Sequence, residues 1–248
     1  MAYLDNSAGR LHQVLEQLAL RSPNSPLPKS WAIALGDEEL RGLDLQRQIM
    51  AVVDLADQAR YDTLDCVEDG EENAPLLRWM SPVMKVQLIA FQDTRTDAVT
   101  QYLAPDVLLS LETAAWELHR RHPEPPIDRG QGQAARDAIA EVITALREDD
   151  QLDQETRDLL IRQAAALQHA LELAWLTGPN AVSDALAGVV GGLAMATLKS
   201  ADATSKPPVL SKVAGVIEVV ANLITIAQGS AAAMIAVAPQ VAGLLGAG

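Results

Sequence analysis

The amino-acid sequence predicts an all-α fold: a multi-helix bundle whose C-terminal part is an uncharged helical hairpin built from small residues. Apolar residues recur at spacings of three and four along most of the chain, whereas the period-two alternation that marks a strand never persists. Aromatic residues make up only 3% of the 248 residues, against 49% for hydrophobic residues as a whole. The interior must therefore be built from Ala, Leu, Val and Ile, which suit close helix packing better than a sheet.

The N-terminal part is predicted to be an acidic helical bundle over 1–121. Its helices are expected over 7–21, 37–67, 73–92, 94–103 and 105–121, where apolar residues recur every three or four positions. Prolines between 22 and 28 end the first helix, and Pro82 is expected to bend the third. The stretch 122–132, HPEPPIDRGQG, combines three prolines with two glycines and is expected to be a linker.

After the linker, the region 133–206 is predicted to hold a helical pair and a helix rich in Gly and Ala. The pair covers 131–147 and 153–176, with Asp153 as an N-cap and with Gly178 and Pro179 as its end signal. The region 207–248 is predicted to be the C-terminal hairpin, with helices over 209–228 and 230–246 and a turn at Gly229 and Ser230. In all, about nine helices are expected.

Charge is distributed unevenly along the chain. The formal net charge is −14, yet from residue 185 onward only Lys199, Asp202, Lys206, Lys212 and Glu218 are charged. Nucleic acid is excluded as a ligand because its binding needs clustered Lys and Arg. The single Cys66 indicates a reducing compartment, and 1–21 has no continuous apolar run of the kind a signal peptide needs. We expect a cytoplasmic protein that associates conditionally with a membrane.

Small residues follow one face of the helix predicted over 185–198, ALAGVVGGLAMATL. Gly188, Gly192 and Ala196 are four residues apart, a spacing that lets helix backbones approach closely in membranes, in oligomers and in soluble hairpins. Fourteen residues span only ~21 Å, short of the ~30 Å hydrocarbon layer of a bilayer. Length therefore favours a buried soluble helix over a membrane span.

A stripe of polar and small residues runs along the helix predicted over 209–228. Its members are four and three residues apart: Ser211, Gly215, Glu218, Asn222 and Thr225. The stripe is interpreted either as the lining of an aqueous path or as the thin exposed edge of a core helix.

The uncharged stretch 219–238 reaches the minimal length of a membrane span, but its composition disfavours a permanent anchor. Asn222, Gln228 and Ser230 interrupt it, and this part of the chain has no Trp or Tyr to sit at a membrane interface. A hairpin that is buried in protein and inserts later remains open.

No motif commits the chain to catalysis, a cofactor or a metal. Nucleophile elbows, Walker loops and dinucleotide fingerprints are absent from the sequence. His119 and His122 have a spacing that can chelate a metal, but Pro123 follows at once and no third ligand is evident. We therefore expect a protein that is not an enzyme.

The leading hypothesis is a non-catalytic helical effector of the bacterial toxin or defence type. After release from the soluble fold, its C-terminal apolar helices would associate with a membrane or permeabilise it. The alternative is a soluble helical adaptor or regulator whose C-terminal helices mediate self-association or dock a protein partner.

Overall fold

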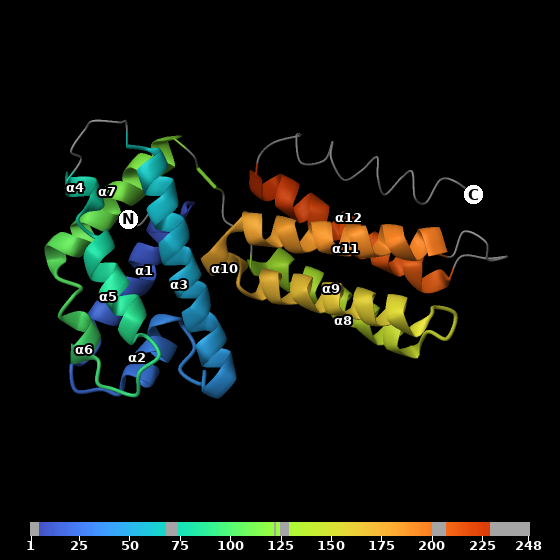
Figure 1. The fold of residues 1–248 in the computed structure, drawn as a ribbon, viewed down its shortest axis with the longest axis horizontal. Helices are drawn as coiled ribbons and strands as arrows, with labels where there is room; N and C mark the ends of the chain where they lie inside the picture. The colour runs from blue at the N-terminus through green and yellow to red at the C-terminus, as the bar shows by residue number, and fades with distance from the viewer. Residues whose placement is uncertain (1–4, 68–73, 122, 125–128, 200–206, 229–248) are drawn as a thin grey trace. The chain divides into compact units, whose positions relative to one another are not determined.

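The structure, a computed structural model, describes residues 5–67, 74–121, 123–124, 129–199 and 207–228 and confirms the all-α prediction (Figure 1). The described residues contain no strand, only an isolated antiparallel bridge between Pro26 and Arg95. The helices are α1 (Ser7–Ala19), α2 (Leu27–Ala34), α3 (Gly42–Asp65), α4 (Ala74–Leu77), α5 (Met80–Ile89), α6 (Asp97–Thr100), α7 (Pro105–Arg121), α8 (Arg129–Glu148), α9 (Gln154–Glu172), α10 (Ala174–Thr177), α11 (Pro179–Lys199) and α12 (Pro208–Gln228).

Three of these helices, α4, α6 and α10, have only four residues. Two of them, α4 and α10, lie where the sequence predicted one continuous helix. The one predicted over 153–176 breaks at Leu173, and the one over 73–92 breaks before Met80. Pro82 was predicted to bend a long helix, but it lies in the first turn of α5. A proline is tolerated there because its missing N–H has no partner inside the helix.

The chain forms two compact units, 1–124 and 125–248, and the predicted linker spans the boundary between them. The linker is shorter than predicted, because α8 already begins at Arg129 and includes the last four residues of 122–132. All three prolines of that stretch precede Arg129, so nothing after them prevents helix formation.

The first unit is built around α1, which packs against α2, α3 and α7. Nine residues of α1 are buried, far more than one face of a surface helix would bury. Asn6 anchors its start: the side-chain oxygen accepts from the Gly9 N–H at 2.9 Å, and Nδ2 donates to the Ala115 carbonyl at 3.0 Å. Arg10, nearly fully buried, pairs with Glu124 at 3.0 Å, which satisfies a charge that would be costly to bury alone.

The second unit is a four-helix bundle. Helix α9 packs against α8 and α11, and α12 packs against α11 and α8, so the four helices close a ring. Consecutive helices of the ring run in opposite directions (Figure 1). Helix α12, assigned by sequence to a separate hairpin at 207–248, thus shares one core with the helices of 133–206. The second helix predicted for that hairpin, 230–246, lies outside the described residues.

Helix α9 begins at the predicted N-cap, Asp153. Its carboxylate accepts from the Thr156 N–H at 2.9 Å and from the Thr156 hydroxyl at 2.6 Å. These two bonds, the hydroxyl one first, hold the pKa of Asp153 below its ordinary value. Lys199, at the end of α11, lies 3.1 Å from Glu155 and 3.9 Å from Asp153, which connects the ends of two neighbouring helices.

We expect Asp153→Ala to lower the melting temperature at neutral pH, because the variant leaves the first N–H groups of α9 without a cap. A carboxyl whose pKa is lowered by folding stabilises the fold above its unfolded pKa and loses that contribution as the pH falls through its folded pKa. The difference in melting temperature between the unaltered chain and Asp153→Ala should therefore narrow below about pH 3.8, the ordinary pKa of Asp. Thermal unfolding followed by circular dichroism measures it, with Asp150→Ala as the control. A difference that persists at lower pH would contradict a contribution from the charge of the Asp153 carboxylate, and equal melting temperatures at neutral pH would contradict the capping role.

Candidate functional site

Two helices of the second unit, α11 and α12, are long and apolar enough to cross a membrane. The qualifying segments are Pro179–Lys199, of mean hydropathy 1.6, and Pro208–Thr225, of mean hydropathy 1.5. Core helices of soluble proteins can pass the same test, so the surroundings of these helices decide how they are interpreted. Only 39% and 50% of the respective segments are buried.

Helix α11 is longer than the sequence predicted. It has 21 residues rather than 14, because it begins at Pro179, which suits the first position of a helix. Gly178, with φ at +80°, ends α10 immediately before it and allows the sharp change of direction. At 1.5 Å per residue α11 is ~31 Å long, so the length argument against a membrane span no longer holds.

The small-residue face of α11 lies against α9. A Cβ atom added to Gly192 would lie 3.2 Å from Leu160 Cδ2 and 3.8 Å from Gln163 Cγ, and one added to Gly188 would overlap the Gln163 side-chain carbonyl. Ala196 is fully buried in the same unit's core. The residues predicted for membrane or oligomer packing thus pack inside the chain in this structure.

The polar stripe of α12 faces outward. Ser211, Gly215, Glu218 and Asn222 are exposed, and nothing lies within 4 Å of a Cβ added to Gly215. Thr225 is partly buried, and its hydroxyl donates to the Ala221 carbonyl at 2.8 Å. Within the described part of the chain, the Glu218 carboxylate makes no hydrogen bond or ion pair. In this arrangement the stripe is the exposed edge of a core helix. It could line an aqueous path only if α12 left the bundle or met the α12 helices of other copies of the chain.

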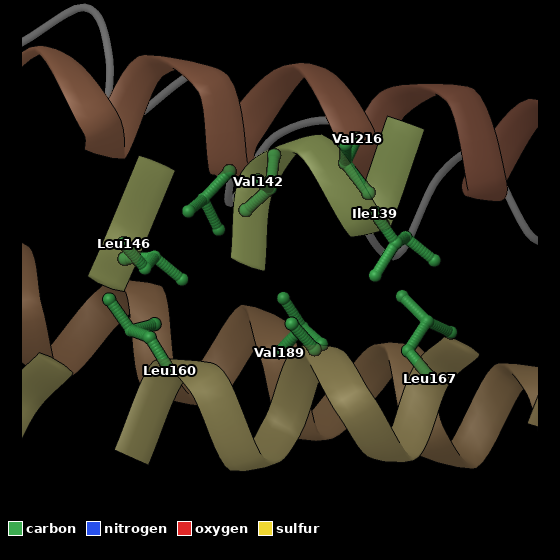
Figure 2. Close-up of a pocket in the computed structure, with 9 residues that line it drawn as sticks. Ile139, Val142, Leu146, Leu160, Leu167, Val189 and Val216 are labelled. Carbon is green, nitrogen blue, oxygen red and sulfur yellow. The ribbon is translucent and has the colours of Figure 1, made fainter. Parts of the chain in front are cut away.

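A small cavity lies at the centre of the described part of the bundle. The cavity has a volume of about 10 Å³ and is lined by nine aliphatic side chains. Figure 2 shows Ile139, Leu160, Val189 and Val216, from four different helices, converging on it. So small and apolar a space barely admits one water and offers that water no polar partner.

Titratable side chains do not gather into a metal site in the described residues. No three His, Cys, Asp or Glu side chains there are grouped so that they could hold a metal. His119 Nδ1 lies 2.6 Å from Asp5 Oδ2, and His122 lies outside the described residues. Burial raises the pKa of the Cys66 thiol, which keeps it in its less reactive protonated form.

Large apolar side chains of α11 and α12 lie in solvent, which the sequence did not predict. In the described part of the second unit these are Met195, Leu198 and Val219, with exposed fractions of 53%, 70% and 47%. Between Asp184 and Lys199 the outward face of α11 has no charge, and it consists of Ala187, Gly191, Met195 and Leu198. We call Ala187, Gly191, Met195, Leu198 and Val219 the outer apolar residues.

The outward faces of α8 and α9 are different, because they carry charged side chains that include Asp137, Glu141, Asp158 and Arg162. The four helices of one bundle thus form two hairpins of different chemistry. The pair α8–α9 is amphipathic. In the other pair, the outward face of α11 is apolar between Asp184 and Lys199, whereas that of α12 combines Val219 with the polar stripe and Lys212. The sequence shows that residues 187, 191, 195 and 198 are four or three positions apart. It does not show which side of α11 faces solvent.

We expect Gly192→Leu to destabilise the second unit by ~1 to 3 kcal/mol, because the new side chain would push α11 away from Leu160. Gly191→Leu is the matched control: it lies one position earlier, has no atom within 4 Å of its added Cβ, and should be neutral or slightly stabilising. Urea unfolding of both variants measures the difference. Equal stability of the two would show that close approach of α11 to α9 does not matter.

No protein-family model, curated protein or solved structure matches this chain. Similarity therefore offers no guide to function, which is inferred from the chemistry of the described side chains.

Proposed function

We propose that the protein is a non-catalytic helical effector whose α11–α12 hairpin leaves the bundle and associates with a membrane. The observation that supports this most is the chemical difference between the two hairpins of the second unit. Both α11 and α12 have the length and hydropathy of membrane helices, and the large exposed apolar side chains described in the unit are on these two helices. A soluble core helix needs no apolar outer face of the kind that α11 has.

Release of the hairpin would exchange one apolar environment for another. The inner faces of α11 and α12, which pack on α9 and α8, are costly to expose to water but not to lipid tails. The helices keep all their backbone hydrogen bonds when they move, which is the main requirement for entry into a bilayer. The outer apolar residues would then contact lipid as well.

The charges of the hairpin lie mostly at its ends. Asp184 is near the start of α11, Lys199 is its last residue, and Lys212 is in the first turns of α12. Lysines near helix ends can extend to the membrane surface. Glu218 is different, because it lies at the middle of α12, where a charge costs ~2.5 to 3.5 kcal/mol or more in lipid. Its carboxyl must become neutral or face water, and Ser211, Asn222 and Thr225 supply the other polar groups of such a path.

We expect the double variant Met195→Glu/Leu198→Glu to abolish membrane binding, because two charges on the outer face of α11 oppose burial in lipid. Flotation with neutral phosphatidylcholine vesicles after brief warming measures binding, and release of a trapped dye measures permeabilisation. The matched control is Ala140→Glu/Ala165→Glu, which adds the same charge to exposed positions of α8 and α9. If the unaltered chain neither floats nor releases dye, or if both double variants lose binding equally, the hairpin is not the membrane element.

We expect Glu218→Lys to reduce or reverse cation preference in planar bilayers while leaving vesicle binding intact, because the change reverses the charge at the middle of the proposed path. The control, Asp184→Lys, makes the same change of charge near a helix end and should alter selectivity little. Single-channel conductance in asymmetric KCl measures the preference. No conductance from the unaltered chain, under any condition that exposes α11 and α12, would contradict a pore.

The second candidate is a soluble adaptor whose α11–α12 surface docks a protein partner or a second copy. The exposure of Glu218 favours it, as does the use of Gly188 and Gly192 inside the bundle, since both suit a hairpin that stays in place. Under this proposal Met195→Glu/Leu198→Glu changes the sedimentation of the protein without lipid and has no vesicle phenotype. Vesicle flotation and sedimentation of this one double variant therefore distinguish the two candidates.

A further inference from the structure

A second apolar surface lies on the first unit, along α3 and α5. The two helices pack side by side and run in opposite directions, as the colours of Figure 1 show. One hydrogen bond sets their relative position: Gln87 Nε2 on α5 donates to the Val53 carbonyl on α3 at 3.1 Å. Val53 and Gln87 therefore mark the line along which the helices meet.

Helix geometry places six exposed residues on one side of that line. At 100° per residue, positions 50, 54 and 57 of α3 lie 40° to 100° around the helix from Val53, and positions 84 and 88 of α5 lie within the same range of angles from Gln87. Phe91 follows the end of α5 by two residues, and it continues the same turn because Ala90 keeps helical backbone angles. In antiparallel helices these equal rotations point to the same face. The opposed rises then set Met50 nearest in height to Phe91 and Asp57 nearest to Met84, with Asp54 between the levels of Met84 and Leu88. We call these six residues the α3–α5 face.

The apolar members of the α3–α5 face are unusually exposed. Leu88 has an exposed fraction of 78%, and Met50, Met84 and Phe91 are each about half exposed. Met84, Leu88 and Phe91 follow the i, i+4, i+7 pattern of a ridge that meets another helix. Methionine adapts its shape to different partners more easily than branched side chains do.

The two acids of the face, Asp54 and Asp57, lack a basic partner. Neither makes an ion pair within the described residues, and partial burial, together with the charge of Asp57, raises the pKa of Asp54. The neighbouring bases are engaged elsewhere: Arg47 pairs with Asp44, Lys85 lies over the Tyr102 ring, and Arg60 lies over the Tyr61 ring. A cation brought to this face would therefore find two unpaired carboxylates.

We propose that the α3–α5 face docks a basic amphipathic helix of a partner protein. The apolar ridge takes the apolar stripe of such a helix, and Asp54 and Asp57 take the Lys or Arg residues that flank it. The net charge of −14 favours the approach of a basic partner. An anionic lipid surface would be repelled by the same two acids, and an uncharged segment would leave them unpaired. The inference is independent of the membrane role of the second unit.

The test uses the full chain and a synthetic amphipathic helix of about 18 residues of Leu and Lys, labelled for fluorescence anisotropy. A matched peptide with Glu in place of Lys is the negative control. We expect saturable binding of the Leu/Lys helix that weakens as salt is added, and no binding of the Leu/Glu helix. Binding of both peptides alike, or of neither, would overturn the proposal.

Two double variants locate the binding. Leu88→Ser/Phe91→Ser should weaken binding roughly tenfold or more, and Asp54→Asn/Asp57→Asn should weaken it several-fold and flatten its dependence on salt. The matched controls are Leu109→Ser, an exposed Leu on α7, and Glu141→Gln/Glu148→Gln, two exposed acids on α8. Circular dichroism verifies that each variant is folded.

Equal losses in the variants and in their controls would mean that the peptide binds the acidic protein nonspecifically, and that would overturn the proposal. The proposal would also fail if Leu88→Ser/Phe91→Ser left peptide binding unchanged but dissociated a dimer in sedimentation, because the face would then join two copies of the chain.

Discussion

The second unit depends on close packing of aliphatic side chains without help from aromatic rings. Trp175 is the one aromatic residue from 125 to 248, so Leu, Ile, Val and Ala must fill the space between four helices. Such side chains fill it only if the helices approach closely, and Gly192 permits this where α11 meets Leu160 of α9. The cavity left at the centre is only about 10 Å³.

This way of building a core has a consequence for α11 and α12. Their inner faces are used by the core and each helix carries few charges, although the outer face of α12 also holds the polar stripe. A helix of that kind is stable in a soluble bundle only while α8 and α9 cover one side of it. The same property would allow it to exchange the bundle for lipid, and Glu218 would then be the main electrostatic obstacle at mid-span.

The first unit is organised differently and carries a different surface. Polar anchors at one end of its central helix, such as Asn6 and the Arg10–Glu124 pair, hold α1 against its neighbours. The outer side of α3 and α5 then combines an apolar ridge with unpaired acids. The two units thus carry two surfaces of unlike chemistry. Under the two proposals, membrane contact and partner recognition would be separate tasks within one chain.

Local signals in the sequence determined much of the fold. Helical spacing was enough to predict the all-α class. Asp153 predicted the start of α9, and Gly178 with Pro179 predicted the break before α11, because capping and backbone conformation depend on a few adjacent residues. Only the tertiary structure decided which side of each helix faces inward. Gly192 could have faced a membrane, a second copy or α9, and the stripe through Glu218 could have lined a path or an edge. The exposure of Met195 and Leu198, and the pairing of α3 with α5, likewise depend on contacts between residues far apart in the chain, which spacing along one helix cannot specify.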